Sequence, residues 1–113
     1  MEKIRVSRLK DFIALAKEGQ HIEASIDLKK LIVIPKVHQA ENERETEMYI
    51  LLGEYSFKVE GEVKKVSKTY MYGISEESTK LALREMHIAN ERLKTDYKRL
   101  RKANIIIERK YFQ

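Results

Sequence analysis

The densest group of chemically active side chains lies near the C-terminus, between residues 92 and 102. Six cations face a single acid there, Asp96. They are Arg92, Lys94, Lys98, Arg99, Arg101 and Lys102. Such a local excess of positive charge attracts phosphates. The alternative is an ordinary solvated helix face, and no aromatic residues alternate with the cations in the pattern typical of single-strand binders.

The side chains that usually carry catalysis or bind metals do not form a recognisable set. The histidines His21, His38 and His87 fall in unrelated segments, and the chain has no cysteine, which argues against a structural zinc site. His87 and Glu91 are spaced to touch on a helix, more as a surface pair than as metal ligands. None of the common nucleotide-binding or hydrolase motifs occurs. We therefore expect a non-enzyme without a metal or a tightly bound cofactor.

Composition and charge narrow the class of protein further. The 113 residues suit one domain, and 42% hydrophobic residues suit a globular one. The net charge of +5 is uneven, because residues 75–113 carry ten basic and six acidic side chains. No apolar run is long enough for membrane insertion, and the N-terminus lacks the apolar stretch of a signal peptide. Together with the absence of cysteine, this predicts a cytoplasmic protein.

The first element expected from the spacing is a short amphipathic helix over residues 7–18. Ser7 is a suitable N-cap and Gly19 a suitable C-terminal stop. The apolar side chains recur at helical spacing, at Leu9, Phe12, Ile13 and Ala16. A strand over residues 12–15 is the alternative.

From His21 to Ile74 the apolar period changes to two, which predicts four to six short antiparallel strands. Lys29 and Lys30 interrupt the first alternation, and a bulge is expected near Lys64. Residues 38–47, rich in glutamate, read as an exposed loop or hairpin tip. A set of short strands can close on itself, which removes exposed edges. The expected fold is α+β: a small antiparallel β-barrel or sandwich with a short N-terminal helix and a long C-terminal helix.

Residues 75 to about 110 contain no glycine or proline and show a heptad pattern, which predicts a coiled coil. Asn90 and Asn104 fall on a positions, where a buried asparagine fixes register. We therefore divide the chain into a β-barrel domain with its helix, 1–74, and an oligomerisation helix, 75–113, that forms a homo-oligomer. The alternative is a long helix lying across its own domain. The seam consists of Leu83, Met86, Asn90, Leu93, Tyr97, Leu100, Asn104 and Ile107.

Two stretches of the strand region, 57–66 followed by 72–75 and 24–31, resemble segments of a known family. The first is similar to the closing strands of a PilZ domain, and the second to its Asp-x-Ser-x-x-Gly strand. A PilZ domain is a small bacterial β-barrel that binds cyclic di-GMP. The resemblance implies ligand-binding roles for Arg5, Arg8 and Asp27. Lys29 stands where the family has serine, and Ile32 stands where it has glycine.

Because of these departures from the ligand motif, the chain resembles a degenerate PilZ-like domain. A branched Ile32 blocks the close backbone approach that glycine allows, so we expect weak or absent cyclic di-GMP binding. The implied function is a non-catalytic, oligomeric signalling or adaptor module that contacts an unidentified protein partner. The alternative is a basic, oligomeric nucleic-acid-binding protein that uses the cations between residues 92 and 102.

Overall fold

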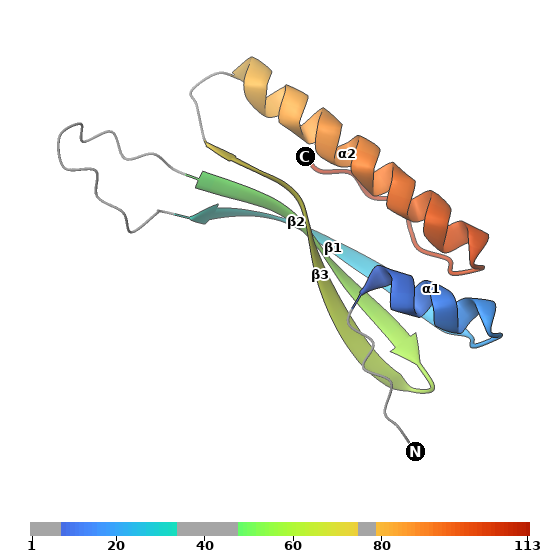
Figure 1. Cartoon of the computed structure of the whole chain (residues 1–113). Coiled ribbons are helices and arrows are strands. Elements are labelled where there is room, and N and C mark those ends of the chain that lie inside the picture. The colour runs from blue at the N-terminus through green and yellow to red at the C-terminus, as the bar shows by residue number, and fades with distance from the viewer. Residues whose placement is uncertain (1–7, 34–47, 75–78) are drawn as a thin grey trace.

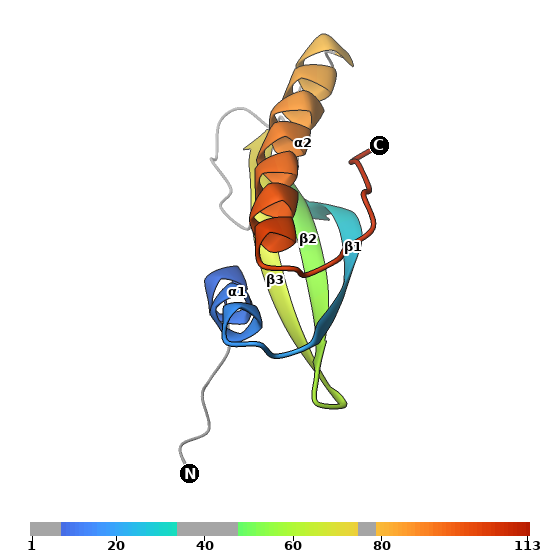
Figure 2. The same ribbon diagram turned by 90° about the vertical axis from the view of Figure 1, so that its right-hand side faces the viewer.

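The computed structural model describes residues 8–33, 48–74 and 79–113. A short helix is followed by three antiparallel strands in the order β1-β2-β3 and then by a second helix. Both helices and the segment after α2 lie on the same side of the sheet (Figures 1 and 2). The elements are α1 (Leu9–Lys17), β1 (Ile22–Val33), β2 (Met48–Val59), β3 (Glu62–Ile74) and α2 (Thr79–Lys102).

The alternation of side chains decides which face of the sheet is covered. In β2 every second residue is buried, and these residues form the inner face that the helices cover: Tyr49, Leu51, Gly53, Tyr55 and Phe57. Cross-strand pairing aligns Tyr55 with Ile26 of β1 and Val66 of β3. Since side chains opposite each other share a face, one apolar strip crosses all three strands.

Two irregularities shape the hairpin of β2 and β3. Glu60 and Gly61 form its two-residue turn, with φ angles of 51° and 83°, and positive φ at both positions is typical of a type I′ turn. The register of the two strands shifts opposite Leu51, between Thr69 and Met71. The bulge therefore lies at Tyr70, and the prediction of a bulge near Lys64 was wrong.

The first helix confirms the predicted amphipathic helix. It covers the far end of the inner face, where the ring of Phe12 stacks on Phe57 with centroids 4.0 Å apart. Its N-cap is Arg8, not Ser7, and Asp11 accepts a hydrogen bond from the Arg8 backbone N–H at 3.2 Å. At the other end Gly19 takes a φ of 98°, the left-handed conformation that glycine adopts at low cost.

One hydrophobic cluster joins both helices, all three strands and the segment after α2. The cluster therefore contains residues from both of the predicted parts of the chain, 1–74 and 75–113. Its largest fully buried side chains are Tyr55, Tyr70, Tyr97, Phe12, Phe57, Leu51, Leu93, Leu100 and Ile105. Among the described residues, no helix combines the length and the apolar character that crossing a membrane requires.

The predicted barrel or sandwich was wrong, because the sheet that residues 22–33, 48–59 and 62–74 form is open and has three strands. The predicted short strands merge into strands of 12 or 13 residues, and β1 runs through Lys29 and Lys30 without a break. The outer face of the sheet is polar at its centre. There Glu54 contacts Lys29 at 3.3 Å and Lys65 at 3.6 Å, which lowers the pKa of the Glu54 carboxyl, chiefly through Lys29.

The predicted long coiled-coil helix was also wrong, because α2 ends at Lys102. Asn104 follows with a φ of 63°. The Ile105 N–H donates to the Leu100 carbonyl at 2.9 Å, and the Asn104 N–H donates to that of Arg101 at 2.9 Å. This pair of bonds is a Schellman motif with asparagine at the left-handed position, so the chain turns back here.

The returning segment, residues 103–113, packs against α2 and the sheet. Ile106 forms a parallel bridge with Glu23 of β1. The Tyr97 hydroxyl bonds the backbone N–H and carbonyl of Lys110, and the Asn90 side chain accepts the Phe112 N–H at 2.9 Å. Two polar residues of the predicted seam, Asn90 and Tyr97, therefore bind their own chain.

The remaining seam residues divide between core and surface. Leu93, Leu100 and Ile107 are buried within the chain, and Met86 is half-buried against the core. Leu83 is 62% exposed, and Asn104 is the helix stop. The buried seam residues pack against the sheet and the C-terminal segment of their own chain. This matches the alternative prediction, in which the helix lies across its own domain.

The helix stop at Asn104 gives a direct test of the fold. We predict that Asn104→Ala lowers the free energy of unfolding by about 1 kcal/mol, since alanine is strained at positive φ. Asn104→Gly should leave it unchanged or raise it. Chemical denaturation followed by circular dichroism measures both. A continuous helix would reverse the order, because alanine is the best helix former and glycine a poor one.

Candidate functional site

A buried carboxylate links α2 to the sheet. Asp96 of α2 is 2% exposed. It accepts hydrogen bonds from Lys68 Nζ at 2.6 Å and from the Tyr70 hydroxyl at 2.7 Å, both from β3. Arg99 Nη1 lies 3.5 Å from its other oxygen. A charge this deeply buried needs such compensation, because its desolvation costs several kcal/mol.

The hydrogen-bond chain continues from Asp96 into β2. The hydroxyls of Tyr70 and Tyr55 are hydrogen-bonded to each other. Since Tyr70 gives its one hydroxyl proton to Asp96, Tyr55 is the donor in that bond. Burial raises the pKa of both tyrosines, and the nearby Asp96 charge raises them further. Both phenols therefore stay neutral, and the chain keeps its direction from Tyr55 to Asp96.

The position of Tyr70 depends on a glycine in the neighbouring strand. A Cβ atom added to Gly53 would lie 2.9 Å from the Tyr70 ring and 3.0 Å from Ile26. Both distances are shorter than ordinary van der Waals contact. Gly53 therefore makes room for the ring that carries the hydroxyl to Asp96.

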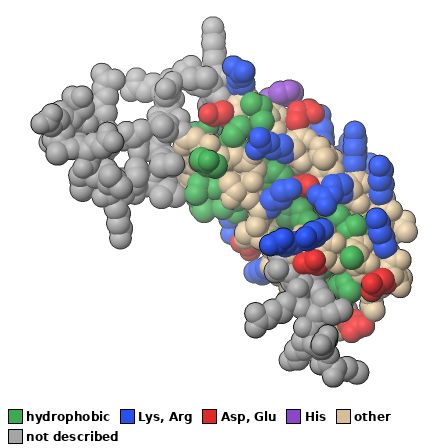
Figure 3. Space-filling view, viewed as in Figure 1, with side chains coloured by type: hydrophobic (Ala, Val, Ile, Leu, Met, Phe, Trp, Pro, Cys, Tyr) green, Lys and Arg blue, Asp and Glu red, His purple; other side chains and the backbone are tan. Residues whose placement is uncertain are grey.

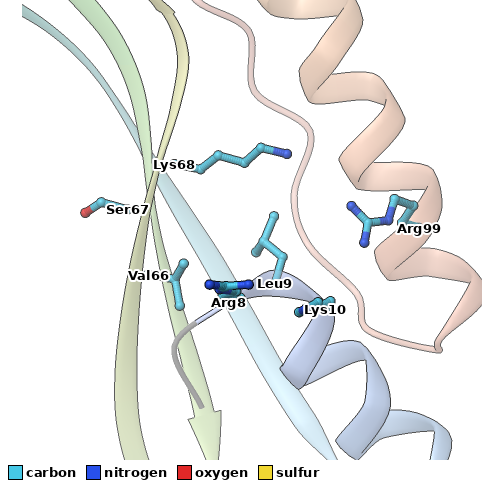
Figure 4. Close-up of a pocket in the computed structure, with 7 residues that line it drawn as sticks. All are labelled: Arg8, Leu9, Lys10, Val66, Ser67, Lys68 and Arg99. Atoms are coloured by element: carbon cyan, nitrogen blue, oxygen red, sulfur yellow. The ribbon is translucent and has the colours of Figure 1, made fainter. Parts of the chain in front are cut away.

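A pocket of about 310 Å³ lies beside this network, between the start of α1, β3 and α2 (Figure 4). Leu9 and Val66, which are 6% and 8% exposed, give it an apolar floor. The Ser67 side chain points away from it (Figure 4). Four cations from three elements complete the lining: Arg8, Lys10, Lys68 and Arg99.

The cations of the pocket continue along α2. Arg92 and Arg99 are seven residues apart on the flank of α2 beside β3, where Arg92 donates to the Tyr70 carbonyl at 2.9 Å. Lys98 and Lys102 are exposed on the same helix. In the space-filling view, lysine and arginine side chains gather over α2 and the neighbouring strand (Figure 3). We call the pocket cations together with Arg92 the basic surface.

The structure does not bring together the ligand residues that the PilZ resemblance implied. Arg8 lines the pocket on the covered side of the sheet. Asp27 is exposed on the opposite face of β1, 3.8 Å from Lys29. Arg5 lies outside the described residues. The two described ligand residues that the resemblance implied, Arg8 and Asp27, therefore lie on opposite sides of the sheet.

The six predicted phosphate contacts are distributed around α2. Arg92 and Arg99 belong to the basic surface. Lys94 is directed to the other flank, where it pairs with Glu91 at 3.1 Å and lies over the ring of Tyr111. The remaining three, Lys98, Arg101 and Lys102, are exposed.

Sequence reasoning missed Lys10 and Lys68 as site residues. A signal for Lys68 was present, because the alternation of Val66, Lys68 and Tyr70 places a lysine on the buried face of its strand. A charge there requires a buried partner or an opening to solvent. Lys10 gave no such signal, since its proximity to β3 depends on how α1 packs.

Comparisons with protein-family models, with curated proteins and with solved structures found no match to this chain. The PilZ resemblance therefore stays a prediction, and the site is interpreted from its own geometry. Among the described residues, no three of histidine, cysteine, aspartate and glutamate gather to hold a metal ion.

The role of Asp96 can be tested by removing its charge. We predict that Asp96→Asn lowers the free energy of unfolding by about 2–3 kcal/mol, because it leaves Lys68 without its buried partner. The control is Glu91→Gln, which removes an exposed acid from the same helix and should change stability little. Urea denaturation compares the two, and equal effects would contradict a special role for Asp96.

Proposed function

We propose that this chain is a non-catalytic protein that binds nucleic acid through the basic surface. The observation that carries the proposal is the convergence of Arg8, Lys10, Lys68 and Arg99 on one pocket. These residues come from α1, β3 and α2, so folding, not local sequence, brings their charges together. An ordinary solvated helix face would draw its cations from one helix only.

The charge balance of α2, the helix that contributes Arg99 to the pocket, supports a polyanion as ligand. Helix α2 carries eight basic and three acidic side chains, and Asp96, one of the three, is buried beneath Lys68. Cations in such excess raise the local concentration of phosphates and release counterions when phosphates bind.

The same surface favours binding without sequence selectivity. Apart from Leu9, Val66 and Ser67 the lining residues are cations, and no aromatic side chain lines the pocket among the described residues. Stacking on aromatic rings and contacts to base edges are the usual means of reading single strands or duplexes. Contacts to the phosphate backbone position a nucleic acid but do not specify its sequence.

The adaptor function implied by the PilZ resemblance has less support. It depends on a closed barrel that contacts a protein partner, and the sheet in the described part of the chain is open. The segment that was assigned to self-association, α2, packs on its own sheet. Nucleic-acid binding requires neither feature.

The proposal predicts a salt dependence that follows particular residues. A 20-nucleotide strand, as DNA or RNA, should bind with an affinity that falls steeply between about 50 and 300 mM salt. The triple variant Arg8→Gln, Lys10→Gln, Arg92→Gln should lower the slope of log K against log salt by about 2–3. Fluorescence anisotropy measures the slope.

The matched control removes the same number of charges elsewhere. Lys17, Lys58 and Lys65 are exposed at the far end of α1 and on the outer face of the sheet. Changing these three to glutamine should preserve the slope. Absence of binding at 50 mM salt, or an equal loss in both triple variants, would contradict the proposal.

A further inference from the structure

The pocket in the basic surface has a volume that suits a compact group. Its volume of about 310 Å³ lies at the lower end of the ~300–1,000 Å³ typical of small-molecule sites. Its lining includes the apolar side chains of Leu9 and Val66, of which only 6% and 8% are exposed. A ligand in the pocket would therefore meet chiefly the cationic side chains around them.

The charge of the pocket matches a dianion. The pocket has four cations. Two acids contact these residues: Asp96 contacts Lys68 and Arg99, and Asp11 accepts a hydrogen bond from the Arg8 backbone N–H. The difference is two positive charges. A phosphodiester carries one negative charge, whereas a phosphate monoester carries about −1.5 to −2 near pH 7. The monoester also has three terminal oxygens, which arginine and lysine can bind together.

One of the cations is held loosely enough to turn towards a ligand. Lys68 contacts Asp96 at 2.6 Å, whereas Arg99 is 3.5 Å from the same carboxylate and its side chain is 48% exposed. Arg99 points from α2 into the space beside Lys68 and Leu9 (Figure 4). It can therefore move to a phosphate while Lys68 continues to compensate Asp96.

From these observations we propose that the pocket binds the terminal phosphate monoester of a nucleic-acid strand. The proposal rests on the proposed function and adds the chemical group that enters the pocket. The terminal phosphate meets Arg8, Lys10 and Arg99, and the first sugar lies beside Leu9 and Val66. The following phosphodiesters lie along the flank of α2 that carries Arg92.

The experiment compares three strands of one sequence that differ only at their ends. One carries a 5′-phosphate, one a 3′-phosphate and one hydroxyls at both ends. Each carries a fluorophore at its centre, and anisotropy is measured at 150 mM salt. We expect a phosphorylated strand to bind at least about tenfold tighter than the hydroxyl strand, the effect of one added charge-assisted hydrogen bond. If only the 5′- or only the 3′-phosphate raises the affinity, the result shows which end of the strand enters the pocket. If both raise it equally, the pocket recognises the phosphate monoester at either end.

Single substitutions test whether the preference for the phosphorylated strand depends on the pocket. Arg99→Gln and, separately, Lys10→Gln should bring the ratio of the two affinities close to one while the hydroxyl strand still binds. Lys10 is exposed and outside the core, so its variant stays informative if Arg99→Gln folds poorly. Lys58→Gln, on the outer face, should keep the ratio.

The pH dependence gives an independent readout. The preference for the phosphorylated strand should fall between pH 7 and pH 5, because the monoester takes up its second proton near pH 6. The hydroxyl strand should show no such change in this range, since its phosphodiesters do not titrate there.

Two results would overturn the proposal in different ways. If phosphorylated and hydroxyl strands bind equally and with steep salt dependence, the basic surface binds nucleic acid but the pocket does not select its end. If none of the strands binds at 50 mM salt, the proposed function fails and the pocket assignment fails with it.

Discussion

A carboxylate buried between a helix and a sheet has to be compensated, and the way this chain compensates Asp96 determines much of its architecture. Lys68 and Tyr70 reach it from β3, and Tyr70 in turn takes a hydrogen bond from Tyr55 of β2. These bonds are directional, whereas the surrounding apolar contacts are not. They therefore fix where α2 lies along the sheet, and the apolar cluster supplies most of the free energy that holds it there.

The same compensation creates the pocket. Lys68 must stay near Asp96, so a cation is held on the covered side of β3 next to the start of α1. Arg99 lies one helical turn beyond Asp96 and extends over the same place. Lys68 and Arg99 compensate the buried Asp96 and are themselves partly open to solvent. An anionic ligand can therefore contact them.

The local elements could be predicted from the sequence, whereas their long-range arrangement could not. The spacing of Leu9 and Phe12 identifies α1, and the alternation from Ile22 identifies the start of β1. The end of α2 was missed because heptad spacing continues through Asn104, and only its left-handed backbone shows that the chain turns back. Barrel closure depends on the number and length of strands, which alternation alone does not determine.

The candidate site shows the same division. The cations of α2 stand together in the sequence, and Arg92 and Arg99 among them do reach the basic surface. The convergence of Lys10 and Lys68 with Arg99 depends on three elements that are far apart in the chain. It results from tertiary packing and leaves little trace in the order of residues.

The central claim is that nucleic acid binds with its terminal phosphate in the basic pocket, and backbone amide signals can locate the ligand directly. In a titration of the ¹⁵N-labelled protein with a 5′-phosphorylated oligonucleotide, amide chemical shifts should change most for Arg8, Leu9 and Lys10, for Val66, Ser67 and Lys68, and around Arg99. Smaller changes should follow near Arg92. Largest changes on the outer face of the sheet, around Asp27 and Glu54, would contradict the claim.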